Sequence, residues 1–252
     1  MSTTDSQPAP RPIDSRDALP RPNPYIVFAL PLAVYLLGGA FESSTPAPPD
    51  AAWWNVGALL PGRLWREDGP HVAGDSVRLR GYPAWRRPGW SSLLIGLLGV
   101  PLWIGLAELQ AGMGINDWFG EGKRVGFDPW NAESLGTDLK MWVFLMFRFT
   151  GLVVVIPIAE EMFLRGFVMR YPQDERWWAV PWGQLDRTSL IIGTLLPMGM
   201  HPHEALAALV WFGMIHWVYT RTKNVWDCVV AHAVTNLGLA IAIVRFELWR
   251  LW

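Results

Sequence analysis

The stretch MWVFLMFRFTGLVVVIPIAEEMFLRG, residues 141–166, decides how this chain folds. Its first part is apolar except for Arg148, and its end places Glu160, Glu161 and Arg165 within six residues. On an α-helix Glu161 and Arg165 share one face because they are four residues apart. A charge at membrane depth costs about 2.5–3.5 kcal/mol on insertion scales, so these groups indicate a functional site. The alternative is that they lie at a helix end among the lipid headgroups.

Composition favours a membrane protein. The chain has 252 residues, of which 51% are hydrophobic and 17 are Trp. Charged residues make up 17%, against about 25% in ordinary soluble domains. The net charge is −1, and no basic tract, zinc-ligand cysteine pair or phosphate-loop signature is present, so nucleic acid is not expected as a partner. The single cysteine, Cys228, lies in an apolar run, which predicts an inert buried thiol.

Long apolar runs predict an all-α fold, a polytopic transmembrane helical bundle of about six to eight membrane helices, short or re-entrant ones included. The runs expected to span the membrane or to enter it are 25–41, 90–107, 141–159, 188–200, 205–220 and 225–244. The run 51–62 is shorter and predicts a short or re-entrant helix. The sequence leaves open whether this run crosses the membrane.

The chain divides into a tail and a membrane domain. Residues 1–24 are rich in Pro, Ser, Thr and Asp and predict a disordered N-terminal tail, while residues 25–252 are expected to form the membrane domain. Six arginines within 63–89 mark a cytoplasmic segment by the positive-inside rule. The acid-rich residues 108–140 suit the external side. The paired glutamates are therefore expected near the cytoplasmic end of their helix.

The later apolar runs also contain polar side chains. His201 follows the run 188–200, whereas His232 and Asn236, four residues apart in the run 225–244, point to one side of a helix. Interhelical hydrogen bonds would account for one such pair. Three runs that each supply a carboxylate, imidazole or amide group are better explained by a shared polar cavity. There a carboxylate can activate water and neutral donors can stabilise an oxyanion, whereas no serine or cysteine lies near a base for covalent catalysis.

Two other polar residues have structural explanations. Asp227 lies near the start of the run 225–244, where the helix dipole favours a carboxylate, and a capping role is expected for it. His216 lies beside aromatic residues in the run 205–220 and is expected to be a packing histidine. Neither residue is included in the predicted site.

Three motifs in order carry a resemblance to a known family. They are EEMFLR at 160–165, GMHPH at 199–203 and HAVTN at 232–236. With them the chain resembles the CAAX protease and bacteriocin-processing family of intramembrane endopeptidases over residues 141–244, which would be its catalytic core. The segment VWDCVVAHAVTNLGLAIAIV with its LWRLW tail resembles, more narrowly, the bacterial CAAX prenyl protease-related branch found with exosortase systems. The family usually has Phe four residues before the histidine of the second motif, where this chain has Pro197.

The resemblance implies a role for each motif residue. Glu160 would be the general base that activates water, and His201 would hold or polarise that water. His232 and Asn236 would stabilise the tetrahedral oxyanion. Glu161, which completes the predicted catalytic set, would orient the site.

Two arginines are predicted to support this site. Arg165 would orient it together with Glu161, a role that their spacing of four residues also permits. Arg148 lies in the middle of its apolar run, and a counter-ion for the carboxylates is our hypothesis for it.

The resemblance leaves two mechanisms in contention. Two histidines and two glutamates could in principle bind zinc. The asparagine of the third motif is a poor zinc ligand and a good oxyanion donor, so a metal-free glutamate mechanism is favoured. No cofactor is therefore expected, and zinc is the alternative.

The expected function is an intramembrane endopeptidase of the inner cell membrane that crosses it several times. It would cut a membrane-associated peptide or protein near the cytoplasmic face, with the lipid bilayer as its other partner. The prenylated CAAX tail that eukaryotic relatives cut is not implied for this chain. One alternative is a non-proteolytic binding protein, such as a chaperone or immunity protein. Another is a transporter or proton relay, although no inverted repeat is visible between the halves of the sequence.

Overall fold

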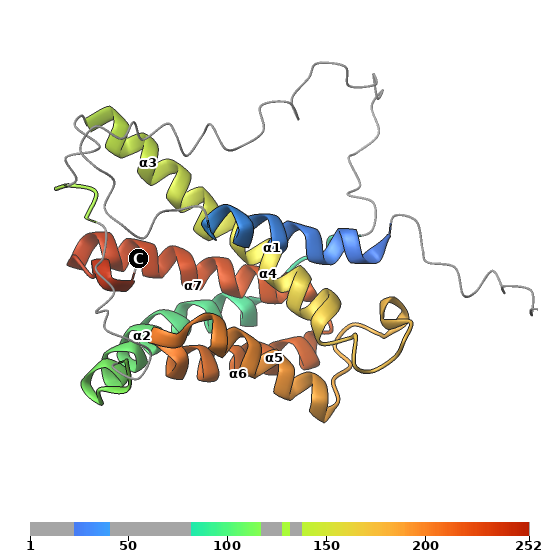
Figure 1. Ribbon diagram of the computed structural model, residues 1–252. Coiled ribbons are helices and arrows are strands. Elements are labelled where there is room, and N and C mark those ends of the chain that lie inside the picture. The colour runs from blue at the N-terminus through green and yellow to red at the C-terminus, as the bar shows by residue number, and fades with distance from the viewer. Residues whose placement is uncertain (1–22, 41–81, 117–127, 132–137, 252) are drawn as a thin grey trace, which may run out of the picture.

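The computed structural model describes residues 23–40, 82–116, 128–131 and 138–251 of the chain (Figure 1). Within these ranges all regular secondary structure is helical. The α-helices are α1 (Pro24–Ala40), α2 (Trp90–Gly112), α3 (Asp138–Thr150), α4 (Ile156–Phe163), α5 (Arg187–Met200), α6 (Ala205–Thr222) and α7 (Val225–Phe246). Short π-helical and 3-10 segments join or follow several of them.

Three helical stretches within the described residues are long and apolar enough to cross a membrane. They are Trp90–Gly112, Asp138–Val168 and Val225–Phe246. Large apolar side chains of α2, including Leu94, Leu97 and Leu98, are exposed on the outside of the bundle. An outer surface of this kind suits lipid contact, because these side chains are exposed among the residues that the structure describes. The fold is therefore a helical membrane bundle, as the apolar runs predict.

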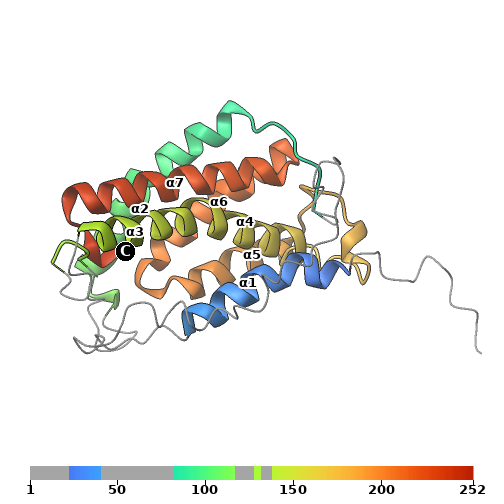
Figure 2. The same cartoon turned by 90° about the horizontal axis from the view of Figure 1, so that it is seen from above.

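The bundle places α7 at its centre. Figure 2 shows α7 with α2 on one side and the helix formed by α3 and α4 on the other, and α1 lies beyond α4. Contacts between the elements agree with this view, since α7 packs on α2, α4 and α6, and α1 packs on α4. The motif-bearing helices α4 and α7 are therefore neighbours although their sequences are far apart.

The close packing of α2 on α7 depends on small residues. A Cβ atom added at Gly96 would lie 2.7 Å from the Ala231 carbonyl oxygen, and one added at Gly99 would lie 2.5 Å from the Thr235 hydroxyl. The Thr235 hydroxyl in turn donates to the Gly96 carbonyl (2.9 Å) and accepts from Trp211 Nε1 (3.1 Å). Small residues at membrane helix interfaces let backbones approach in this way, and the approach fixes α7 against α2 and α6.

A single helix of 31 residues, Asp138–Val168, carries the first motif. It contains two π-helical turns, at Gly151–Val155 and Leu164–Val168, on either side of α4. Such turns widen a helix by one residue and often occur at functional sites. Here they flank the segment that carries the glutamate pair.

The described helices match the predicted runs with shifts at their ends. Pro24, placed in the tail by sequence, is the first residue of α1, a position that proline tolerates because its missing N–H has no helical partner there. The run expected to end near residue 159 continues as helix to Val168, so the glutamate pair lies inside the helix. Residues 1–22, the run 51–62 and most of the arginine-rich segment lie outside the described residues, and the division into tail and membrane domain stays a prediction.

Candidate active site

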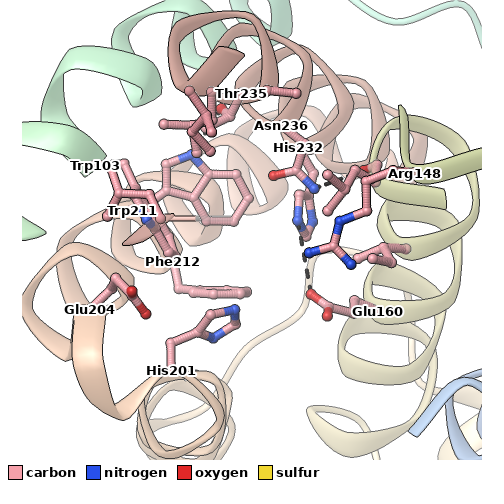
Figure 3. Close-up of a pocket in the computed structure, with 16 residues that line it drawn as sticks. Trp103, Arg148, Glu160, His201, Glu204, Trp211, Phe212, His232, Thr235 and Asn236 are labelled. Carbon is pink, nitrogen blue, oxygen red and sulfur yellow. Dashed lines mark hydrogen bonds and ion pairs between the residues drawn. The ribbon is translucent and has the colours of Figure 1, made fainter. Parts of the chain in front are cut away.

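A cavity of about 190 Å³ lies between the motif-bearing helices. Figure 3 shows side chains from separate helices that point into it. The polar and charged residues that line it are Arg148, Glu160, His201, Glu204, His232, Thr235 and Asn236. Aromatic walls come from Trp103, Trp211 and Phe212. Four of the five predicted catalytic residues therefore line one cavity.

The two adjacent glutamates occupy different environments. Neighbouring residues of a helix point about 100° apart, so only one of them can face the cavity directly. Glu160 lines the cavity and its side chain is 13% exposed. Glu161 is fully buried behind the cavity wall, where its Oε2 atom lies 2.6 Å from Nη1 of Arg165. This arrangement separates a carboxylate that can meet substrate from one that is held by an arginine.

His232 connects the two carboxylates. Its Nδ1 atom lies 3.0 Å from Glu161 Oε1, and its Nε2 atom lies 3.8 Å from Glu160 Oε2. The Trp211 ring meets the imidazole in an edge contact, with 4.8 Å between the ring centroids. Glu161 therefore orients His232 through Nδ1 and leaves Nε2 directed to the cavity, in the way that carboxylates orient catalytic imidazoles.

Asn236 is held by a backbone carbonyl that the first π-helical turn releases. The N–H of Ile156 donates to the Gly151 carbonyl, five residues earlier. With the same spacing the Leu152 carbonyl would need a donor at Pro157, which has no N–H. Asn236 supplies that donor, because its Nδ2 atom lies 2.9 Å from the Leu152 oxygen. The proline and the π-helical turn together fix the amide at the edge of the cavity.

His201 stands on the opposite side of the cavity from Glu160 (Figure 3). It follows the last residue of α5, and its Nδ1 atom lies 2.8 Å from the Pro197 carbonyl oxygen. The ring of Trp103 meets it edge-on at 5.5 Å between centroids. Pro197 thus occupies the place of the usual Phe without displacing the histidine from the cavity.

The turn after His201 is held from α2. Gln110 is fully buried. Its Nε2 atom donates to the Pro202 carbonyl (2.8 Å), and its Oε1 atom accepts from the Leu206 N–H (2.8 Å). The same Nε2 atom lies 2.7 Å from Asn116 Oδ1. A single glutamine therefore satisfies backbone groups on both sides of the turn between His201 and α6.

The start of α5 is capped by an aspartate. The Ser189 N–H donates to Asp186 Oδ1 at 2.7 Å. This hydrogen bond favours the ionised carboxylate and lowers the pKa of Asp186 below its usual value. The cap fixes the beginning of the helix whose end presents His201.

A buried cluster supports the cavity from behind. Arg165 is fully buried, and its Nη2 atom lies 3.4 Å from His216 Nδ1. The Tyr219 hydroxyl lies 3.5 Å from the Arg165 carbonyl oxygen. His216, predicted as a packing residue, is thus also a polar neighbour of the arginine that holds Glu161.

Comparison with known families identifies the segment that builds this cavity. Residues 142–238 match the family model described as type II CAAX prenyl endopeptidase Rce1-like. The chain is similar to this Rce1-like family over that segment. The similarity supports a protease of the CAAX type in general terms. Comparisons with curated proteins and with solved structures found no match to the chain.

The Rce1-like segment contains all five predicted catalytic residues and both predicted supporting arginines. The rest of the chain completes the cavity. Trp103 of α2 forms part of its wall, and Leu251 reaches it from a 3-10 turn after α7 (η8, Trp249–Leu251). Trp103 belongs to no motif, whereas Leu251 lies in the LWRLW tail that carries the narrower resemblance.

Sequence reasoning also missed Glu204, a buried carboxylate on the cavity wall. It lies in the 3-10 turn η7 (Pro202–Glu204), immediately before α6. A signal was present, because an acidic residue directly before an apolar run often marks a helix start. Asp227, predicted as a cap, lies in the first turn of α7 but accepts from the Gly89 N–H at the start of α2 (2.6 Å), whereas Asn224 caps α7.

The donor set offers little for a metal ion. Among the residues described by the structure, no group of three or more His, Cys, Asp or Glu side chains is arranged to hold one. Glu160 and His232 would be two ligands, but Glu161 is engaged by Arg165, and the polar groups that follow His232 on the cavity wall of α7 are the Thr235 hydroxyl and the Asn236 amide. We therefore derive no catalytic step through a metal.

Proposed function

We propose that this protein is an intramembrane endopeptidase in which Glu160 activates a water molecule for attack on a peptide bond. The observation that carries the proposal is the shared cavity, which is lined by Glu160 of α4, by His201 after α5, and by His232 and Asn236 of α7. A binding protein would need a cavity, but it would not need a carboxylate opposite a set of hydrogen-bond donors.

In the first step Glu160 accepts a proton from water, and the hydroxide oxygen bonds to the scissile carbonyl carbon. His201, on the other side of the cavity, holds the water for this transfer. The carbonyl π-electrons move to oxygen and form a tetrahedral oxyanion. General-base catalysis of this kind contributes about 10²–10⁴-fold to the rate.

The oxyanion is stabilised by donors that are already oriented. The Asn236 amide has two N–H bonds, of which one donates to Leu152, so the other is available to the oxyanion. His232, fixed through Nδ1 by Glu161, supplies an N–H from Nε2 when the ring is doubly protonated. In the second step the oxyanion collapses, the C–N bond breaks, and Glu160 returns its proton to the leaving amine.

We further propose that the substrate is a membrane-associated peptide or protein cut near the cytoplasmic face of the inner membrane. Support comes from the positive-inside rule, because Arg176 and Arg187 follow the helix that carries Glu160 and 63–89 is rich in arginine. No cofactor is part of this mechanism, and zinc dependence is the competing version of it.

The test uses purified protein in liposomes with a library of membrane-associated tail peptides. We expect Glu160→Gln to abolish cleavage and Asn236→Ala to lower kcat about 10²–10³-fold, as removal of an oxyanion donor does. Exposed Glu175→Gln is the matched control and should cleave as the wild type does.

Two outcomes would contradict the proposal. Loss of cleavage on treatment with a strong chelator, restored by zinc, would replace the metal-free mechanism. Full complementation of a deletion strain by Glu160→Gln would show that the biological role does not need hydrolysis, and the binding alternative would then hold.

A further inference from the structure

Arg165 connects two helices behind the cavity wall. It lies in the π-helical turn Leu164–Val168 and is fully buried. Its Nη1 atom lies 2.6 Å from Glu161 Oε2 in α4, and its Nη2 atom lies 3.4 Å from Nδ1 of His216 in α6. His216 is itself buried and does not line the cavity. The proposed mechanism therefore gives it no part, although a polar side chain so deep in a membrane bundle calls for an explanation.

The chemistry of the guanidinium determines the protonation of His216. Every N–H of an arginine is a donor, and the group stays charged in proteins. Nδ1 of His216 must therefore accept from Arg165, which leaves the ring neutral with its proton on Nε2. A doubly protonated ring would instead place a second cation 3.4 Å from the guanidinium in a buried position. His216 thus serves Arg165 as a neutral acceptor.

The two oxygen atoms of Glu161 have different partners. Oε2 lies next to Arg165, whereas Oε1 lies 3.0 Å from Nδ1 of His232. A guanidinium often binds a carboxylate through two parallel N–H bonds, one to each oxygen. Such a pair through Nη1 and Nη2 would occupy both oxygens of Glu161 and take Oε1 from His232. Oε1 stays with the histidine because Nη2 of Arg165 is bound to His216 instead.

We propose that His216 is a positioning residue for His232. By accepting from Nη2, it restricts Arg165 to one oxygen of Glu161, and the other oxygen then fixes the orientation of the His232 ring. Nε2 of His232 stays directed to the cavity, 3.8 Å from Glu160 Oε2. This inference rests on the proposed function, because it takes His232 as a donor to the oxyanion.

The kinetic test compares two replacements of His216 in liposomes with the library of tail peptides. His216→Leu keeps a side chain of similar size and removes the acceptor, so Nη2 of Arg165 can pair with Glu161 and His232 loses its orienting partner. We expect kcat to fall about 10–100-fold with little change in KM, because a misplaced catalytic group costs rate. His216→Asn can place an amide oxygen where Nδ1 lies and should keep most of the rate.

Two controls separate positioning from stability. Ser189→Ala removes another fully buried polar side chain, whose Oγ donates to the Met169 carbonyl (2.6 Å) and which does not line the cavity. It should lower the temperature of thermal unfolding and retain kcat. In a Glu161→Gln background, His216→Leu should cost little further rate, because its effect passes through that carboxylate.

The imidazole rings can also be observed without a substrate. The chain has five histidines, so NMR spectra of protein labelled with ¹⁵N in these rings can be assigned by single substitutions. We expect His216 to carry a proton on Nε2 and none on Nδ1 at neutral pH. His232 should carry a hydrogen-bonded proton on Nδ1. The resonance of that proton should shift or disappear in His216→Leu and persist in His216→Asn.

The outcomes distinguish this inference from the proposed function. A proton on Nδ1 of His216, or an unchanged His232 resonance in His216→Leu, would overturn the inference and leave the endopeptidase standing. Equal losses of rate in His216→Leu and His216→Asn, each in proportion to lost stability, would also refute it and make His216 a packing residue. If the wild type cleaved no peptide, the proposed function would fail. The spectra would then decide alone whether His216 orients His232.

Discussion

Gln110 offers a test of whether the site depends on residues outside the Rce1-like segment. Replacement by Leu keeps most of the side-chain volume and removes every hydrogen bond that it makes. The Pro202 carbonyl and the Leu206 N–H, at 2.8 Å from the glutamine in the wild type, then lose their partners in a fully buried position. The consequence should appear at His201, which directly precedes this turn.

The magnitude follows from the two orphaned backbone groups. Each buried group left without a partner costs about 1–3 kcal/mol. Hydrogen bonds within membranes average only about 0.6 kcal/mol, so the lower half of that range applies. At about 1–2 kcal/mol for each of the two groups, Gln110→Leu should lower the free energy of unfolding by about 2–4 kcal/mol. A shift of about 1 Å in a catalytic group can cost about 10²-fold in rate, and we expect kcat to fall 10–100-fold with a smaller change in KM.

The assay measures kcat, KM and thermal unfolding of the same preparation. Gln173→Leu is a matched control, because Gln173 also donates to two backbone carbonyls, those of Met169 (2.8 Å) and Gln184 (3.1 Å), but does not line the cavity. The control should lose stability with little loss of kcat. If Gln110→Leu and Gln173→Leu lost activity only in proportion to stability, the positioning role of Gln110 would be wrong.

Two further predictions concern charge. Arg165→Met removes the guanidinium from the buried Glu161 carboxylate, which then keeps only His232 as a partner, and should destabilise the protein by about 3–5 kcal/mol, measured by thermal unfolding in detergent. Arg165→Lys should recover part of this loss, and a loss below about 1 kcal/mol would contradict the ion pair. Asp186→Ala removes the cap of α5. Because the folded state lowers the pKa of Asp186, its stabilisation is present above the unfolded pKa and is lost as pH falls through the folded one. The stability difference between wild type and Asp186→Ala should therefore shrink as pH falls below about 4, and a difference independent of pH would refute the assignment.

The sequence predicted the parts of the site that a motif can carry. Spacing of four residues relates Glu161 to Arg165 and His232 to Asn236, and the structure shows an ion pair for the first and neighbouring positions on the cavity wall for the second. Their convergence with His201 followed from the cost of polar groups in apolar runs. The assignment of catalytic roles to these residues stays a prediction.

The other parts of the site depend on contacts between helices, which the spacing of residues in the sequence does not predict. Gln110 and Trp103 lie on a helix without a motif, and their importance follows only from the packing of α2 against the turn before α6. The sequence also does not show that Glu160 lines the cavity while Glu161 is buried against Arg165, because this depends on how the helix is rotated about its axis. Pro157 is visible in the sequence, but its effect on the Leu152 carbonyl requires knowledge of the hydrogen-bond spacing in the preceding turn.

The π-helical turn at Gly151–Val155 determines how the site would respond to the deletion of a residue. A π-helical turn is equivalent to one residue inserted into an α-helix. Loss of one residue within Gly151–Val155 would restore a regular helix and rotate everything before it by about 100° relative to Glu160. Arg148 would then leave the cavity while every motif stayed intact. Homologues that lack this inserted residue would thus keep the motif residues in the cavity and lose Arg148 from it. The presence or absence of the π-helical turn is therefore a feature by which related proteins can differ.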